Sequence, residues 1–328
     1  MYQMMSLPLY SGTLGEYNSW RDLGQELERL GCDGIEGVWG GEDLPKDLPA
    51  ELILGYHLIF YPDWLDFYRD DRAALKQKFG SLEVTASFYG GLGPDTLLEQ
   101  YRADLRRAVN LGARYVVFHV SDVSLEEGYT YRWLHTNQEV IDAAVEVVNL
   151  ILGEERWPFE FLVENQWWPG FTFTEPEETA RLLEGIRFAG KGILLDTGHL
   201  MNACTELKTE AEGADYIRSM LNRHGSLAKW VRGVHLHQSL SGAYVKAHTG
   251  SLPAGLPEDY MERFGVSYQH ILQIDQHRPW ADPAILSVLE QIEPRYLTHE
   301  LSSRGRMARA EAVSVQTRLL QQGGRMRV

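Results

Sequence analysis

The chain has 328 residues, 44% of them hydrophobic and 23% charged, a composition typical of a soluble globular protein with one large α/β domain or two ordinary ones. Its net charge of −15 disfavours a broad nucleic-acid-binding surface, and no apolar run approaches the roughly 20 residues that span a bilayer. The N-terminus lacks the pattern of a secretory signal, and the only cysteines, Cys32 and Cys204, form no CxxC pair. These features predict a cytoplasmic protein without membrane segments or a thiolate metal site.

One architectural unit recurs along the chain. An apolar run of strand-forming residues ends in polar or ionisable residues, and a loop and an amphipathic helix follow it. The predicted strands cover residues 4–10, 33–39, 52–58, 115–120, 159–164, 192–196, 231–237 and 296–301. The predicted helices cover residues 20–30, 71–88, 96–111, 138–152, 176–186, 216–230, 283–292 and 308–321. Gly31 is placed to end the first helix and Thr174 and Asp282 to cap two later ones, whereas residues 238–282 are expected to be the least regular part of the chain.

Eight strand-then-helix units in 328 residues average about 41 residues each, the size of the βα unit in a (β/α)₈ barrel. Parallel strands need crossover connections, which the helices provide. A doubly wound open sheet is the alternative, but no G-x-G-x-x-G follows the first strand, which weakens its dinucleotide-binding form. No shift in composition marks a linker. The sequence therefore predicts an α/β protein with a single TIM-barrel domain over residues 1–328 and extended loops at the C-terminal ends of the strands.

From the third strand onward, each predicted strand ends in side chains that can bind a metal. They are His57, His119, Glu164, Asp196 with His199, His235 or His237, and Glu300. Any one of them has an ordinary structural explanation, such as a local hydrogen bond, a salt bridge or a helix cap. In a barrel, however, all these strand ends surround the same mouth, and burying so many carboxylates and imidazoles together without a cation is costly. The pattern therefore predicts a divalent-metal site.

Four motifs at the ends of the last four strands, FLVEN, LLDTGH, GVHLHQS and THEL, occur in this order. Together they resemble the xylose isomerase-like TIM-barrel superfamily, which contains sugar epimerases and isomerases, inosose dehydratase and endonuclease IV. The resemblance covers essentially the whole chain at the level of its units. It implies that one divalent metal is held by Glu164, Asp196, His235 and Glu300, and that His199 faces the substrate or a further metal.

The endonuclease IV branch of this superfamily uses three zinc ions, and its additional histidines resemble His57 and His119. Its V-D-R-H segment resembles residues 245–248, in which His248 matches but Lys246 replaces an aspartate ligand. Because a protonated lysine cannot bind a metal, the resemblance implies one or two ions per chain rather than three. The nitrogen and oxygen ligands accommodate Zn, Mn, Mg or Co, and the added imidazoles favour Zn or Mn.

Two carboxylates on opposite sides of one metal suit proton transfer next to a carbonyl. The sequence therefore predicts an isomerase or epimerase that acts through an enediolate on a small sugar, polyol or hydroxy-carbonyl compound. Glu164, Glu300 and His199 are its candidate catalytic residues. The candidate substrate-binding residues are the aromatic Trp39, Trp167 and Trp168 and the polar Lys246, His237 and Arg278. Each of them has the alternative of loop packing or of solvated surface charge.

A metal-dependent phosphodiesterase acting on abasic-site DNA is the main alternative, supported by the histidines outside the four motifs. The acidic stretches 42–71 and 121–139, with net charges of −6 and −3, oppose it, because they would repel a duplex. A barrel that binds a sugar or a metal without turnover is the third possibility. A small-molecule substrate is therefore expected and a nucleic-acid partner is not, whereas the sequence leaves open whether the protein is a monomer or a homo-oligomer.

Overall fold

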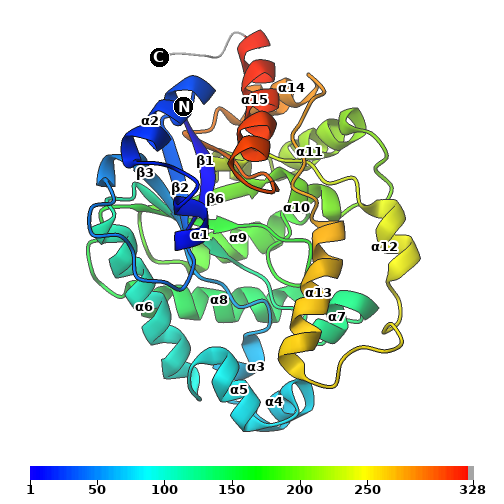
Figure 1. Cartoon of the computed structure of the whole chain (residues 1–328). Coiled ribbons are helices and arrows are strands. Elements are labelled where there is room, and N and C mark those ends of the chain that lie inside the picture. The colour runs from blue at the N-terminus through cyan, green and yellow to red at the C-terminus, as the bar shows by residue number, and fades with distance from the viewer. Residues whose placement is uncertain (324–328) are drawn as a thin grey trace.

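Eight short runs of buried apolar residues form the strands of a closed parallel barrel, in the order β1 to β8, in the computed structural model (Figure 1). The structure describes residues 1–323, so residues 324–328 of the predicted domain lie outside the described part. The strands are β1 (Tyr2–Leu9), β2 (Gly34–Trp39), β3 (Ile53–His57), β4 (Tyr115–His119), β5 (Glu160–Glu164), β6 (Lys191–Asp196), β7 (Val231–His235) and β8 (Tyr296–His299). This arrangement confirms the predicted (β/α)₈ barrel and excludes the open sheet.

Helices surround the barrel and supply the crossover connections (Figure 1). They are α1 (Ser11–Leu14), α2 (Trp20–Leu30), α3 (Leu65–Tyr68), α4 (Arg72–Phe79), α5 (Leu82–Tyr89), α6 (Pro94–Asn110), α7 (Leu125–Thr130), α8 (Asn137–Leu152), α9 (Pro176–Gly185), α10 (Thr197–Asn202), α11 (Glu210–His224), α12 (Gly242–His248), α13 (Tyr260–Ile274), α14 (Ile285–Ile292) and α15 (Arg306–Gln322). Short 3₁₀ turns cover Ala50–Leu52 and Gly225–Trp230. Within residues 1–323, no helix is both long and apolar enough to cross a bilayer.

Several boundaries differ from the sequence prediction. The single helix expected over residues 71–88 is divided by Gly80, whose φ of 86° ends α4 before α5 begins. The connection expected to be irregular contains α12 and the 15-residue helix α13. Gly31 ends α2 in the left-handed conformation as predicted. The predicted cap at Thr174 is wrong, since Glu175 precedes α9 without a side-chain cap, whereas Asp282 accepts a hydrogen bond from the Ala284 backbone N–H at the turn that opens α14.

The lower part of the barrel is filled by side chains that point inward from alternate strand positions. This interior cluster consists of Met4, Leu54, Tyr115, Val117, Leu162, Leu194 and Tyr296. The Tyr115 ring occupies the space above Gly55, where an added Cβ atom would overlap with it. The Tyr115 hydroxyl then donates a hydrogen bond to Glu36 at 2.6 Å. The packed core thus ends in a polar layer, which forms the floor of the barrel mouth.

The last helix, α15, is held against the start of the chain by ion pairs. Arg306 pairs with Asp22 and Glu26, both at 2.7 Å, and Arg309 pairs with Glu16. β1 also pairs in parallel with β8 over four residues. The two ends of the described chain are therefore fastened to each other at both the sheet and the helix layer.

A buried cluster of charges fixes α3 and α4 next to the barrel mouth. Lys78 lies 2.7 Å from both Asp63 and Asp66, and His135 lies 3.2 Å from Asp66. Asp122, which follows β4 by three residues, accepts hydrogen bonds from the backbone N–H groups of Trp64 and Leu65. Asp63 and Asp66 were counted among the acidic loop charges in the sequence, but the structure buries both of them. The cluster ties the segment after β3 to the end of β4.

His135 is expected to make the stability of this region depend on pH. The hydrogen bond to Asp66 raises the pKa of His135, so its contribution is fully present below the ordinary value near 6.5 and is lost as pH rises through the raised value. Urea unfolding of the wild type and of His135→Asn should therefore differ more at acidic pH, below the ordinary pKa of about 6.5, than at alkaline pH above the raised pKa. A difference that grows with pH would contradict the assignment.

Candidate metal centre

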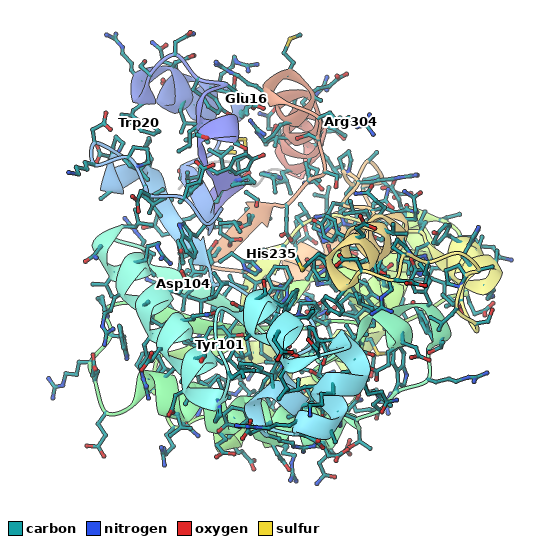
Figure 2. The ribbon with its side chains drawn as sticks, turned by 60° about the horizontal axis from the view of Figure 1, so that its bottom comes forward. Glu16, Trp20, Tyr101, Asp104, His235 and Arg304 are labelled. Atoms are coloured by element: carbon teal, nitrogen blue, oxygen red, sulfur yellow. The ribbon has the colours of Figure 1, made fainter. Side chains whose placement is uncertain are left out.

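The strand ends bring the predicted ligands to one level of the barrel mouth. The parallel register pairs His119 with Glu164 and Asp196 with His235. The closing residues of β3 to β7 are His57, His119, Glu164, Asp196 and His235, and Glu300 directly follows β8. Figure 2 shows His235 near the centre of the molecule, between the N-terminal elements and α13. These side chains fall into three adjoining groups.

The first group consists of His57, His119 and Glu164. Oε2 of Glu164 lies 3.3 Å from Nε2 of His57 and 3.0 Å from Nε2 of His119. Nδ1 of His57 lies 2.8 Å from the carbonyl oxygen of Leu58 and can donate its hydrogen there. That bond leaves the lone pair of Nε2 facing the group, which is the tautomer required of a metal ligand.

The second group shares Glu164 and adds Asp196, His235 and Glu300. Oε1 of Glu164 lies 3.5 Å from Nδ1 of His235, and Oε2 of Glu300 lies 2.9 Å from the same nitrogen. Oδ1 of Asp196 caps α10 by accepting from the His199 backbone N–H at 2.6 Å, while Oδ2 faces the group. The capping role and the ligand role of Asp196 are thus compatible. Glu164 faces both groups with different oxygens, as a bridging carboxylate does.

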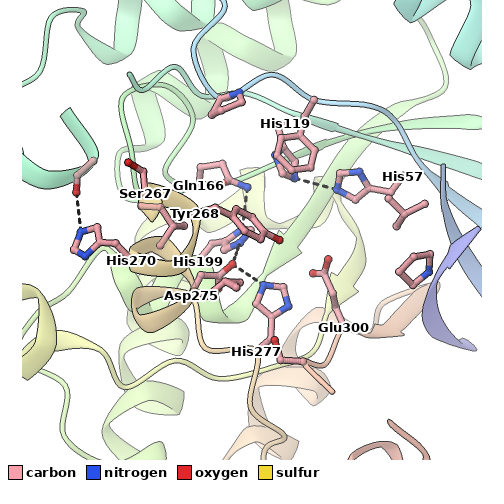
Figure 3. A pocket seen from close by; sticks show the side chains of 18 of the residues that line it. His57, His119, Gln166, His199, Ser267, Tyr268, His270, Asp275, His277 and Glu300 are labelled. Atoms are coloured by element: carbon pink, nitrogen blue, oxygen red, sulfur yellow. Dashed lines mark hydrogen bonds and ion pairs between the residues drawn. The ribbon is translucent and has the colours of Figure 1, made fainter. Parts of the chain in front are cut away.

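The third group consists of His199, His237, Asp275 and His277, and Figure 3 shows His199, Asp275 and His277 turned toward one another. Oδ2 of Asp275 lies 3.2 Å from Nε2 of His199 and 2.5 Å from Nε2 of His277, and the His237 and His277 rings stack with centroids 4.1 Å apart. Neither Asp275 nor His277 was predicted. Their D-x-H spacing just beyond α13 was the signal available in the sequence.

The segment 245–248, which was expected to approach the metals, lies elsewhere. His248 is exposed and stacks on Tyr244, and Lys246 pairs with Glu206. His248 is in none of the three groups, because α12 carries it on a different part of the long β7–β8 connection. Asp275 and His277 provide the aspartate and histidine that residues 245–248 do not. The structure therefore offers three candidate metal positions, where the sequence implied one or two ions.

Glu36 supports the second group from below and was also missed. It is fully buried on β2 and lies 2.9 Å from Nε2 of His235, and Tyr115 and Thr298 donate to its other oxygen. Nδ1 of His235 is thereby directed toward Glu164 and Glu300. A carboxylate behind a ligand imidazole fixes its orientation and makes it a better donor to a metal. The acidic residue within the apolar strand DGIEGVW was the available signal.

The electrostatics of the mouth fit a resident cation. Glu164, Asp196 and His235 are at most 1% exposed, and among the described residues neither oxygen of Glu164 has a hydrogen bond of good geometry. Burial alone would raise the pKa of Glu164, but His119 and His235 hold it well below its ordinary range. Burial would likewise lower the pKa of His277, and Asp275 raises it to about 9. Divalent cations would neutralise these buried carboxylates and satisfy their free lone pairs.

His237 was expected to point away from His235 unless the strand had already ended. β7 does end at His235, and Nε2 of His237 turns to within 2.8 Å of Oδ2 of Asp196. The imidazole of His237 occupies the space beside Gly198, where an added Cβ atom would overlap with the ring. Only a glycine at position 198 leaves room for this contact.

Gly198→Ala is therefore expected to displace His237 and to weaken the third group. Metal analysis of the purified variant should show about one ion fewer than the wild type, with the other two retained, because the third group does not share Glu164. The matched control is Gly24→Ala on α2, where an added Cβ atom meets nothing within 4 Å. An unchanged metal content in Gly198→Ala would show that the His237 position is not needed.

A cavity of about 720 Å³ opens above the groups. Trp167 and Trp168 line it as expected of substrate-binding residues, together with His57, His119, His199 and Glu300. Trp39 does not line it, because its ring packs under the Arg107 guanidinium at 3.7 Å. Lys246 and Arg278 also lie outside its lining, both on the β7–β8 connection.

The sequence pattern of the family described as xylose isomerase-like TIM barrel matches residues 25–313. A structure described as a D-tagatose 3-epimerase-like protein is similar over 99% of this chain and 98% of that one, with a TM-score of 0.53 and 15% identity. Endonuclease IV from Thermus thermophilus is similar over 98% of this chain and 100% of that one, with a TM-score of 0.53 and 16% identity. Mannonate dehydratase from Streptococcus suis serotype 2 is similar over 100% and 96%, with a TM-score of 0.52 and 13% identity. No curated protein matches the chain, and likeness at these identities shows the fold alone.

Proposed function

We propose, from the premise that this chain belongs to the xylose isomerase-like TIM-barrel family, that it is a multi-metal hydrolase of small phosphoesters. The family includes enzymes of several reaction types, so the choice among them depends on the groups at the mouth of this barrel. One observation carries the proposal. Three adjoining ligand groups lie side by side, and Glu164 belongs to two of them. We propose zinc or manganese as the resident ions, because the groups contain both imidazoles and carboxylates.

The layout of the three groups suits phosphoryl chemistry better than proton transfer at carbon. Enediolate chemistry needs one metal between two carboxylates, and the second group alone would supply it. The first and third groups would then have no chemical purpose, although together they contain five histidines, three of them buried. Metal ions held by the three groups would supply what phosphoryl transfer needs, namely polarisation of a phosphoryl oxygen, a lowered pKa of water and stabilisation of the charge on the leaving oxygen.

The chain's own residues would hold and orient these components. Glu164 keeps the first and second positions adjacent, and Glu36 fixes the ring of His235. Glu300 and Asp275 are the carboxylates of the three ligand groups that line the cavity, so they can accept a proton from the attacking water or position it. Trp167 lies with its ring centroid 5.1 Å from that of His199 and helps to exclude bulk water from this side.

A small molecule fits the surroundings better than duplex DNA. The cavity has the size of typical ligand pockets. α13 lies beside α7 at the lower right of Figure 1 and contributes residues to the cavity lining. The net charge of −15 also opposes phosphate-rich polymers. Phosphoester hydrolysis without nucleic-acid recognition is the combination that we propose.

Isomerisation or epimerisation of a small sugar is the second candidate. The observation in its favour is that Glu164 and Glu300 both face Nδ1 of His235, at 3.5 and 2.9 Å, and so flank one metal position. In that reaction, one carboxylate would remove the carbon-bound proton and the other would return it. The same cavity would then hold the sugar.

Two assays on metal-loaded protein separate these candidates. Release of 4-nitrophenol from bis(4-nitrophenyl) phosphate reports hydrolysis, and deuterium uptake from heavy water into a panel of ketohexoses and ketopentoses reports proton transfer at carbon. We expect hydrolysis that is lost with a chelator and restored by zinc or manganese, together with a metal content above two ions per chain. Deuterium uptake without hydrolysis would replace the proposal by the second candidate. Cleavage of abasic-site DNA at a higher rate than that of bis(4-nitrophenyl) phosphate would instead support the endonuclease alternative.

A further inference from the structure

One wall of the cavity is an apolar and aromatic surface that is only partly used in packing. On α13, Met261, Phe264, Tyr268 and Ile271 recur at helical spacing and all line the cavity. Met261 and Tyr268 are 52% and 51% exposed, and so is 48% of Phe60 on the loop after β3. Phe264 and Ile271 also pack against neighbouring hydrophobic side chains, whereas Met261 and Tyr268 are left exposed at the cavity.

Two of these rings lie close to the proposed reaction centre. The Phe60 ring centroid is 4.5 Å from that of His119, in the first ligand group. Tyr268 lines the cavity from α13, and Figure 3 shows it in the same close view as His199, Asp275 and Glu300. Burial raises the pKa of the Tyr268 hydroxyl, and the charges of Asp275 and Glu300 raise it further, so this group stays neutral. A flat apolar substituent bound between Phe60 and Tyr268 would be next to a phosphate held at the ligand groups.

The cavity provides little cationic charge for a polyanion. Of the described residues that line it, Arg309 is the one lysine or arginine, and it is paired with Glu16. A second phosphate or a carboxylate would therefore find no free cation away from the metals. The ligand must carry its charge on one phosphoryl group.

We infer that the substrate is a small phosphoester with a single phosphate and one flat, apolar ring, selected by Phe60 and Tyr268. This inference rests on the proposed hydrolase function and adds the chemical class of its substrate. The ring stacks against the aromatic wall and displaces water from it, while the phosphate is held at the ligand groups. A sugar phosphate with hydroxyls in place of the ring would leave the apolar stripe in contact with polar groups.

Calorimetric binding of two probes to the zinc-loaded protein tests the inference without requiring turnover. Phenyl phosphate and methyl phosphate carry the same charged group and differ in the ring. We expect phenyl phosphate to bind about tenfold more tightly or better, as burial of a ring predicts. In the double variant Phe60→Ala, Tyr268→Ala this preference should fall to about twofold or less, with the affinity for methyl phosphate unchanged, because the phosphate contacts remain. Val266→Ala is the matched control, since Val266 is 45% exposed on α13 but does not line the cavity.

Equal binding of the two phosphates, or a preference that survives in the double variant, would overturn the inference. If bis(4-nitrophenyl) phosphate is hydrolysed in that case, the hydrolase proposal stands and only the ring selection fails. If neither phosphate binds and no phosphoester is hydrolysed, both fail together. A phenyl preference that depends on Phe60 and Tyr268, found in a protein without hydrolytic activity, would support the binding site and overturn the reaction.

Discussion

Glu164→Gln is expected to lower phosphoester hydrolysis by about a thousandfold, or about 4 kcal/mol of transition-state stabilisation. The amide keeps the size of the side chain but removes the negative charge that two ligand groups share. It also replaces one acceptor oxygen by an N–H₂ group, which cannot bind a cation. Metal analysis should therefore show a loss at the first and second positions, with the third position retained.

Glu160→Gln is the matched control for this variant. Glu160 opens the same strand at its opposite end, where it pairs with Arg232 and Arg295 far from the barrel mouth. Activity and metal content of Glu160→Gln should equal those of the wild type within twofold. Full activity in Glu164→Gln would refute the bridging role and the proposed reaction together.

Lys78→Met is expected to destabilise the fold by about 3–5 kcal/mol, the typical cost of removing one partner from a buried ion pair. Lys78 lies between Asp63 and Asp66, and methionine fills its volume without its charge. Burial raises the pKa of Asp63 to about 7 even with Lys78 present, so acid allows this carboxyl to take up a proton. The loss of stability in Lys78→Met should therefore be larger at pH 8 than at pH 5.5, on either side of that value.

Urea unfolding of Lys78→Met and of Lys76→Met measures this effect. Lys76 is on the same helix but is exposed, so its replacement should change the free energy of unfolding by about 0.5 kcal/mol or less. Equal effects of the two substitutions would show that the buried cluster contributes no net stabilisation. An effect of Lys78→Met that is larger at acidic pH would contradict the protonation of Asp63.

The barrel and the first two ligand groups could be predicted because both follow from local pattern. A parallel strand that is buried on both faces must be apolar throughout, so an ionisable residue at its end is conspicuous. Glu164, Asp196 and His235 each follow such a run, and a closed barrel brings their strand ends to one mouth. The sharing of Glu164 with a second metal at His57 and His119 was also anticipated, but the distances required coordinates, because the register between strands is a tertiary property.

Asp275 and His277 could not be placed from pattern, because no strand precedes them. They follow α13 in a long connection, and the packing of α13 against α7 and α12 decides where they point. A metal ligand was predicted in the segment 245–248 instead, although α12 carries His248 on the exposed side of this connection. Glu36 was overlooked because its strand ends in Trp39 rather than in an ionisable residue. Ligand residues could thus be predicted where a strand end fixes the direction of the side chain, but not where a loop fixes it.

The closure of β1 on β8 has a consequence for how this protein is made. Until Tyr296–His299 leave the ribosome, β1 has one unpaired edge, and Asp22, Glu26 and Glu16 lack the arginines of α15. The nascent barrel therefore presents an open sheet edge until β8 has been made, and it can close only when β8 and α15 are both available. Truncation before residue 306 is expected to give a chain that is retained by chaperones or aggregates, whatever its remaining ligands.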